Sequence, residues 1–321
     1  MTGEKRSIKD ILLEVYAKAG VLVILLIMCI ALGILTPGFL DPVNLMNVIR
    51  QTAFYAMIGL GSMMVIVTCG IDMSPGSVLG MTSVFVVFAA APGEGNVVLW
   101  LFIAILTGAA VGFINGSLVA FCAMPPFIVT LGTQIIGRGI ALLLTNGRPE
   151  GRINENLAFL GRGSLLGIPM PILFMIICCV VTWYILRYTK IGRHIYAVGG
   201  NETAAKVSGI NTKLVKLFVY TYAGILAGIS GLSLTGRVNS GQPNLGEGYE
   251  LFSIAGAVIG GTSLSGGVGT VYGVVCGSLV IGVLNNGMVL LGLSAYWQKV
   301  AQGTIIIVAV LLDQLRKKSS K

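Results

Sequence analysis

Ten apolar segments of spanning or near-spanning length, two of them short, make up most of this chain of 321 residues. A helix needs about 20 predominantly apolar residues to cross the roughly 30 Å hydrocarbon core of a bilayer. The sequence therefore predicts an all-α, polytopic membrane protein with about ten transmembrane helices in a single domain, residues 1–321. The segments lie near 19–36, 51–70, 75–91, 97–121, 126–144, 169–188, 214–235, 252–265, 268–291 and 295–313.

Composition agrees with lipid as the main solvent of the chain. Hydrophobic residues make up 55% of it and charged residues 10%, whereas a soluble domain carries about 25% charged residues. The 45 glycines are about twice the usual share. Several recur four residues apart, which predicts close packing of helices: Gly108, Gly112 and Gly116, Gly224 and Gly228, and Gly269, Gly273 and Gly277.

The distribution of Lys and Arg predicts the orientation of the chain. Cytoplasmic loops carry an excess of these residues, so the basic segment 1–18, the basic C-terminus and the loop 187–213 are expected inside the cell. Both termini are then cytoplasmic, which requires an even number of spans and agrees with ten. The net charge of +9 is accounted for in this way, without a nucleic acid partner.

The longest loop expected outside the cell, 145–168, opposes the positive-inside rule mildly. It contains Arg148, Arg152 and Arg162. These arginines are candidates for docking an acidic surface of a partner on that side. The alternative is an ordinary solvated loop.

Catalytic, metal-binding and ATP-binding motifs are missing from the sequence. No lysine follows a glycine, so a Walker A motif is excluded. The one histidine, His194, rules out multi-histidine metal sites and weakens any Ser-His-Asp interpretation. The six cysteines lie in apolar runs without CxxC spacing, which favours buried free thiols. We expect a transport subunit with no enzymatic activity, no catalytic residue, no bound metal and no cofactor of its own.

Ionisable residues inside the apolar segments are few. Asp72 and Arg138 are the main candidates, whereas ion-driven carriers usually contain more such groups. We therefore expect the chain to form a transport pathway and another subunit to supply the energy for transport. A secondary, ion-coupled carrier that needs no ATPase, and a membrane scaffold that transports nothing, remain the alternatives.

The stretch GIDMSPGS, residues 70–77, interrupts two apolar runs. Ser74 followed by Pro75 predicts the N-cap and first residue of a helix. The negative charge of Asp72 near the positive N-terminal end of that helix would be stabilising. The overlapping stretch 69–76 is echoed in residues 260–267 at a constant offset, because Gly70 matches Gly261, Ser74 matches Ser265 and Gly76 matches Gly267 (261 − 70 = 191). Interrupted helices in equivalent positions are typical of transport pathways. We expect a capped break between two spans near the cytoplasmic end.

A short helix is predicted within the loop 187–213. Asn201 is a good N-cap and Glu202 follows in the first turn. Gly209 is a C-cap signal. Such a helix either docks into a groove of a cytoplasmic subunit or simply connects two spans.

Several motifs resemble those of the bacterial monosaccharide ABC importer permeases. They are TCGIDMSPGSVLG (68–80), IGRHIYAVGGNETAAKVSGIN (191–211), the stretch 241–270 and LNNG (284–287), with PPFIVTLGT (125–133) and TNGRP (145–149) in support. The resemblance runs nearly end to end. Met73 and Pro75 depart from the family motif, in which leucine and an apolar residue are usual.

The resemblance implies a set of partners in the bacterial cytoplasmic (inner) membrane. Two permease subunits, identical or paralogous, would form the pore. A cytoplasmic subunit with ATP-binding cassettes would bind the ATP, and a periplasmic or lipid-anchored sugar-binding protein would deliver a monosaccharide. Ribose is the expected sugar, although the residues do not distinguish it from xylose, arabinose, galactose, allose or autoinducer-2.

The resemblance also implies where the coupling residues lie, and polar residues in the broken or glycine-rich spans are candidates for the pathway and gate. The alternative for each polar residue is a helix cap or an interhelical hydrogen bond. The expected coupling residues are Gly199, Gly200, Asn201, Glu202, Ala204, Ala205, Ser208 and Gly209. The pathway and gate candidates are Asp72, Ser74, Thr262, Ser263, Ser265, Asn285 and Asn286.

Overall fold

The structure is a computed structural model that describes residues 8–90, 95–151, 153–294, 296–304, 307 and 311, with side chains from residue 20 onward. Within these residues the fold is built almost entirely of helices, with one antiparallel pair of two-residue strands, β1 (Ser164–Leu165) and β2 (Ile168–Pro169). The helices are α1 (Ile8–Leu35), α2 (Pro42–Val67), α3 (Pro75–Ala89), α4 (Val97–Phe121), α5 (Pro126–Thr145), α6 (Glu155–Arg162), α7 (Met170–Tyr188), α8 (Lys190–Gly200), α9 (Glu202–Val207), α10 (Thr212–Val238), α11 (Tyr249–Ile259) and α12 (Val271–Leu290).

The predicted all-α, polytopic membrane protein is confirmed. Six described helices are long and apolar enough to cross a membrane, namely α2, α4, α5, α7, α10 and α12. Three shorter apolar helices accompany them: residues 20–35 of α1, α3 and α11. Each coincides with a predicted apolar segment to within several residues, except that α2 begins earlier than predicted. The tenth predicted segment, 295–313, extends into residues outside the described part of the chain.

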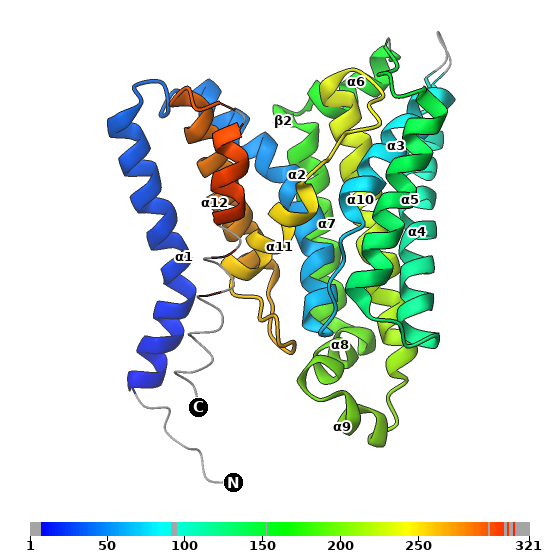
Figure 1. Ribbon diagram of the computed structural model, residues 1–321. Coiled ribbons are helices and arrows are strands. Elements are labelled where there is room, and N and C mark those ends of the chain that lie inside the picture. The colour runs from blue at the N-terminus through cyan, green and yellow to red at the C-terminus, as the bar shows by residue number, and fades with distance from the viewer. Residues whose placement is uncertain are drawn as a thin grey trace.

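Helices α2 and α10 form the centre of the bundle. The most apolar part of α2 is 83% buried and that of α10 is 67% buried, against 22% for α5 and α7. Because α5 and α7 each leave a group of apolar side chains exposed, one side of each is suited to face lipid. The short helix α3 packs between α5 and α10 (Figure 1).

Glycine allows α4 and α10 to approach closely. A side chain at Gly108 would overlap the carbonyl oxygen of Gly224, and one at Gly224 would overlap the carbonyl oxygen of Gly108. Gly112 lies in the same way against the carbonyl of Tyr220. The predicted packing role of glycines four residues apart is therefore confirmed for this pair of helices.

The connecting segments lie at opposite ends of the bundle (Figure 1). Helices α8 and α9 lie at one end, together with the start of α1, and α6 and the β1–β2 hairpin lie at the other. The chain descends through α2 to the α8–α9 end and then turns back, as an extended stretch, to the start of α3 inside the bundle. The loops 187–213 and 145–168 are thus separated by the thickness of the bundle, in agreement with the predicted topology.

Candidate functional site

The break between α2 and α3 begins a helix where the sequence predicted it, but with different hydrogen bonds. Ser74 is the N-cap of α3 and Pro75 its first residue. The Ser74 hydroxyl makes no capping bond. It donates to Oδ1 of Asp72 at 2.6 Å and accepts a bond from Nδ2 of Asn115 in α4 at 2.9 Å. The predicted capping role of the hydroxyl is therefore wrong, because its oxygen accepts from Asn115 and its proton is donated to Asp72.

Asp72 is fully buried, with only 1% of its surface exposed. Its Oδ1 also accepts a bond from the backbone N–H of Ser74 at 2.9 Å, while Oδ2 has no hydrogen-bond partner among the described residues. At Gly70 a side chain would overlap Oη of Tyr220 in α10, which shows how closely the returning chain packs. The chain re-enters the bundle after the exposed Cys69, so Asp72 lies inside it rather than at its mouth.

A second polar group joins α3, α5 and α11. The Arg138 guanidinium donates to the carbonyl oxygens of Gly76 and Leu245, each at 3.0 Å. Glu250, 5% exposed, accepts a bond from Nε2 of Gln134 at 3.0 Å, and its other oxygen approaches Gly76 so closely that a side chain there would overlap it. Of these residues the sequence pattern singled out only Arg138. Glu250 was missed because it was assigned to a loop, although its place at the start of an apolar run was a usable signal.

A polar cavity of about 310 Å³ opens between α2, α11 and α12. The Tyr55 hydroxyl accepts bonds from Nε2 of Gln51 at 2.9 Å and Nδ2 of Asn285 at 3.4 Å. Amide, phenol and carboxylate groups beside aromatic rings suit a polyhydroxylated ligand, because each hydroxyl needs a donor or an acceptor. The side chains that give the cavity this character are Gln51, Tyr55, Glu247, Tyr249, Asn285 and Asn286.

Asn286 also has a structural role beside this cavity. Its side-chain amide exchanges two hydrogen bonds with that of Asn44 near the start of α2, at 2.8 and 3.0 Å. The pair joins α12 to α2. Of the two predicted pathway asparagines, Asn285 is therefore the one whose amide has more capacity to bind a ligand.

The remaining pathway candidates lie in the loop between α11 and α12, at the α8–α9 end. Thr262 is buried, and the Ser263 hydroxyl accepts a bond from the Ser265 backbone at 3.3 Å. The structure thus separates the seven candidates into three groups rather than one site. They are the pair Asp72 and Ser74, the loop residues Thr262, Ser263 and Ser265, and the pair Asn285 and Asn286.

The short helix α9 forms as predicted. Oδ1 of Asn201 caps it by accepting a bond from the Ala204 N–H at 2.9 Å, and Gly209 adopts the left-handed conformation with φ of 81°. Ala205 packs inward, whereas Val207 is 85% exposed. Val207 is thus part of the surface that α9 presents at this end of the bundle.

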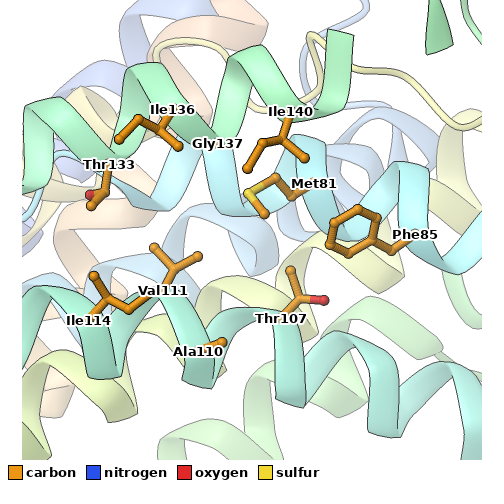
Figure 2. Close-up of a pocket in the computed structure, with 10 residues that line it drawn as sticks. All are labelled: Met81, Phe85, Thr107, Ala110, Val111, Ile114, Thr133, Ile136, Gly137 and Ile140. Carbon is orange, nitrogen blue, oxygen red and sulfur yellow. The ribbon is translucent and has the colours of Figure 1, made fainter. Parts of the chain in front are cut away.

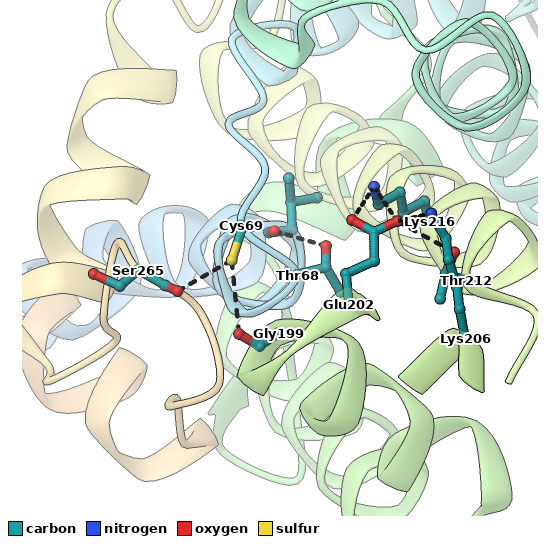
Figure 3. A network of polar contacts seen from close by, with 9 residues as sticks. Thr68, Cys69, Gly199, Glu202, Lys206, Thr212, Lys216 and Ser265 are labelled. Carbon is teal, nitrogen blue, oxygen red and sulfur yellow. Dashed lines mark hydrogen bonds and ion pairs between the residues drawn. The ribbon is translucent and has the colours of Figure 1, made fainter. Parts of the chain in front are cut away.

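Glu202 clamps α9 to α10 (Figure 3). Its carboxylate lies 2.8 Å from Nζ of Lys216 and 3.4 Å from Nζ of Lys206, and it accepts a bond from the Thr212 hydroxyl at 3.2 Å. Partial burial acts to raise the pKa of Glu202, but hydrogen bonding and charge from Lys216 and Lys206 outweigh it and hold the pKa below its usual range. The clamp is fully present at neutral pH and is lost as pH falls through this lowered pKa.

Helix α8 meets the last residue of α2 and the loop before α12 at a single backbone contact. A side chain at Gly199 would overlap the carbonyl oxygen of Val67, the last residue of α2, and would lie 2.6 Å from the backbone nitrogen of Gly267. The Gly267 N–H donates to that same Val67 carbonyl at 2.9 Å. Cys69 adds a thiol bond to the Ser265 carbonyl at 3.1 Å (Figure 3). The two segments that echo each other at an offset of 191 residues therefore converge on α8.

The arginines expected to dock a partner lie at the opposite end. Arg148 is exposed, and Arg152 lies outside the described residues. Arg162, at the end of α6, is exposed but already donates from Nε to the carbonyl of Arg237 at 2.8 Å. Residues 150 and 241 form a β-bridge that holds the two loops of this end together.

A separate cavity of about 200 Å³ between α3, α4 and α5 has the wrong lining for a sugar (Figure 2). Its walls are almost wholly apolar, and of its two threonines Thr133 already donates its hydroxyl to Asn115 at 2.7 Å. Such a surface suits an apolar chain rather than a polyhydroxylated ligand.

Comparison with known proteins identifies the family of the chain. Residues 44–310 match the family model described as the permease component of branched-chain amino acid transport systems. The chain belongs to this permease family. The match covers every helix discussed above from the start of α2 onward, including α8 and α9.

Individual relatives resemble the chain over almost its whole length. The ribose import permease protein RbsC of Bacillus subtilis (strain 168) is 44% identical over 95% of both chains. RbsC of Escherichia coli (strain K12) is 40% identical over 92% of this chain and 93% of its own. The D-allose transport system permease protein AlsC of the same strain is 36% identical over 94% and 93%, respectively. No solved structure gives a significant match.

The contact at Gly199 can be tested with its neighbour as the control. We expect Gly199→Ala to lower the thermal stability of the purified protein, since its methyl group has no space beside Val67 and Gly267, and overpacking typically costs about 1–3 kcal/mol. Gly200→Ala should leave stability unchanged, because nothing lies near a side chain there. Equal melting temperatures for the two variants would contradict the contact.

Proposed function

We propose that the chain is the permease subunit of an ATP-binding cassette importer that carries a monosaccharide, ribose being the favoured sugar. A separate ATPase subunit binds and hydrolyses the ATP, and a sugar-binding protein delivers the substrate. The proposal is supported by the family and by relatives whose names specify ribose and D-allose. The family description specifies amino acids, but the polar and aromatic lining around Tyr55 and Asn285 favours a neutral polyol over a zwitterion.

The observation that carries the proposal is the contact of α8 with the last residue of α2 and the loop before α12. A subunit that binds the exposed Val207 side of α9 would also move α8, because only Asn201 separates the end of α8 from the start of α9. Movement of Gly199 cannot leave Val67 and Gly267 in place, since the three backbones are in contact. ATP-driven motion would in this way reach the break before α3 and the loop before α12.

In the proposed orientation the α8–α9 end faces the cytoplasm. It carries most of the basic residues of 187–213, as the positive-inside rule requires. Ten spans with both termini in the cytoplasm complete the topology, and the location is the bacterial inner membrane. Two copies of the chain, or this chain and a paralogue, would enclose the pathway.

The cavity beside Asn285 is proposed as the outer part of the sugar pathway, and Arg148 and Arg162 as contacts for the sugar-binding protein at the same end. Few and weak polar contacts suit a pathway, since a substrate must leave as readily as it enters. Asp72 and Ser74 are assigned a structural role, because Oδ1 of Asp72 and the Ser74 hydroxyl bond to each other and the hydroxyl also bonds to Asn115.

Reconstitution tests the function directly. Proteoliposomes that contain the chain, the ATPase subunit and the sugar-binding protein should take up labelled ribose only when ATP is supplied, and a proton uncoupler should have no effect. Uptake by this chain alone that an uncoupler abolishes would show a secondary carrier instead. Absence of any sugar or amino acid uptake, with a correctly assembled complex, would favour a scaffold.

The two asparagines of the polar cavity should respond differently to substitution. Asn285→Leu is expected to slow uptake with little loss of thermal stability, since it removes a group that lines the cavity and makes only one long bond of 3.4 Å. Asn286→Leu should lower stability, because it leaves the Asn44 amide without its partner. Normal uptake by the Asn285→Leu variant would argue against a pathway at this cavity.

Substitutions of Asp72 test whether its side chain has a structural role or a role in proton-coupled transport. Asp72→Asn keeps the Oδ1 acceptor for the Ser74 N–H and hydroxyl, so transport should continue without a new dependence on pH. Asp72→Leu removes the acceptor and should destabilise the start of α3. Uptake and melting temperature, measured from mildly acidic to mildly alkaline pH, distinguish the two variants. A strong pH shift in the Asn variant would overturn the structural role.

A further inference from the structure

A large cavity at the α8–α9 end of the bundle has no part in the pathway proposed above. It encloses about 770 Å³ between the end of α7, the start of α8 and the residues that lead into α12. The polar and aromatic side chains that line it are Trp183, Arg187, Arg193, Tyr196 and Tyr272. Leu186 and residues 267–271, which include Thr270, complete the lining.

The two arginines of this cavity have no compensating charge. Arg187 and Arg193 are both exposed, and neither forms an ion pair within the described part of the chain, where the carboxylates that do so are Glu202 and Glu247. The cavity lining contains no acidic residue. Guanidinium groups present paired N–H donors that match the oxygens of a phosphate. A cavity with two such groups and no acid therefore attracts an anion.

The backbone at the start of α12 adds to this attraction. The first N–H groups of a helix have no partner within the helix and carry a partial positive charge. Val271 and Tyr272, the first two residues of the 20-residue α12, line the cavity. Anions bind readily at such helix starts.

A hydrogen bond joins two residues of the cavity lining. The Tyr196 hydroxyl of α8 donates to the carbonyl oxygen of Gly269 at 2.7 Å. Burial raises the pKa of Tyr196, so the phenol keeps the proton that it donates at neutral pH. A site tied in this way loses little freedom when a ligand enters.

Exposed aromatic rings place the cavity at the level of the membrane surface. Trp183, Tyr184, Tyr188 and Tyr272 are between 49% and 57% exposed. Trp and Tyr gather where the hydrocarbon core meets the headgroups, because one part of each ring is apolar and another is polar. The arginines thus lie where lipid phosphates lie.

We propose that this cavity binds the phosphate group of an anionic phospholipid, with Arg187 and Arg193 as its ligands and Trp183 and Tyr272 beside the glycerol and upper acyl chains. The orientation proposed above puts the site in the cytoplasmic leaflet. The basic cavity near Lys206 and Lys216 is less suited to this role, because Glu202 already engages both lysines.

Tryptophan fluorescence tests the site, because Trp183 is in its wall. The full-length chain in nanodiscs of zwitterionic lipid is titrated with phosphatidylglycerol or phosphatidylcholine, each brominated near the glycerol. Brominated phosphatidylglycerol should quench more strongly at equal mole fraction, and Trp183→Phe should remove the excess. Equal quenching by the two lipids would overturn the proposal, and so would an excess that survives Trp183→Phe.

Charge variants identify the ligands of the phosphate. The double variant Arg187→Gln/Arg193→Gln should bind phosphatidylglycerol about tenfold more weakly, as expected for the loss of charge-assisted hydrogen bonds. Lys213→Gln, which removes a positive charge at the same end but outside this cavity, should bind as the wild type does. Equal weakening by both would show a general surface charge effect and overturn the site.

Inorganic phosphate distinguishes the lipid from a soluble source of the same group. Addition of excess inorganic phosphate at constant ionic strength should leave the excess quenching intact, because the acyl chains hold the lipid in the membrane. Loss of the quenching would assign the cavity to a soluble phosphate and overturn the lipid assignment. The readout is binding, so its failure would leave the transport function untouched.

Discussion

The backbone contact at Gly199 is the constraint on which the rest of the α8–α9 end depends. Three segments that are remote in sequence meet there: α8 at Gly199, the end of α2 at Val67, and the loop residue Gly267, whose N–H donates to the Val67 carbonyl. Any side chain at Gly199 would separate them. Because backbone atoms make the contact, a displacement of α8 reaches α2 and the loop before α12 without being absorbed by side-chain rotation.

Inside the bundle, polar groups are arranged by the need to satisfy one another away from water. Asp72, Ser74, Asn115 and Thr133 form a chain of hydrogen bonds through α3, α4 and α5. A lone carboxylate or amide in a bilayer costs several kcal/mol, whereas linked groups offset most of that cost. The carboxylate of Asp72 is therefore better understood as the anchor of a short interrupted helix than as a site for moving protons.

Local sequence signals predicted the spanning helices and the caps of α9, but they did not predict the long-range hydrogen bonds inside the bundle. Apolar runs predicted the spanning helices because length and hydrophobicity alone decide insertion, and Asn201 and Gly209 predicted the ends of α9 because capping involves only near neighbours. The hydrogen bonds of Ser74 depend on Asn115, 41 residues away, and the burial of Asp72 depends on the chain returning into the bundle. Glu250, which was assigned to a loop, likewise depends on a distant partner, since Gln134 lies 116 residues away.

Two routes connect α9 to the bundle, and they differ in physical character. The ion pair of Glu202 with Lys216 ties α9 to the start of α10, and it is partly exposed and sensitive to salt. The Gly199 contact ties α8 to α2 and to the loop before α12 through backbones that salt does not weaken. A partner shifts the conformation of the bundle only by as much as it binds one arrangement better than another. The Gly199 contact couples α8 to the bundle more tightly than the ion pair does, because backbone atoms in contact move together without side-chain rearrangement. The ion pair of Glu202 with Lys216 then keeps α9 in position for the partner to bind.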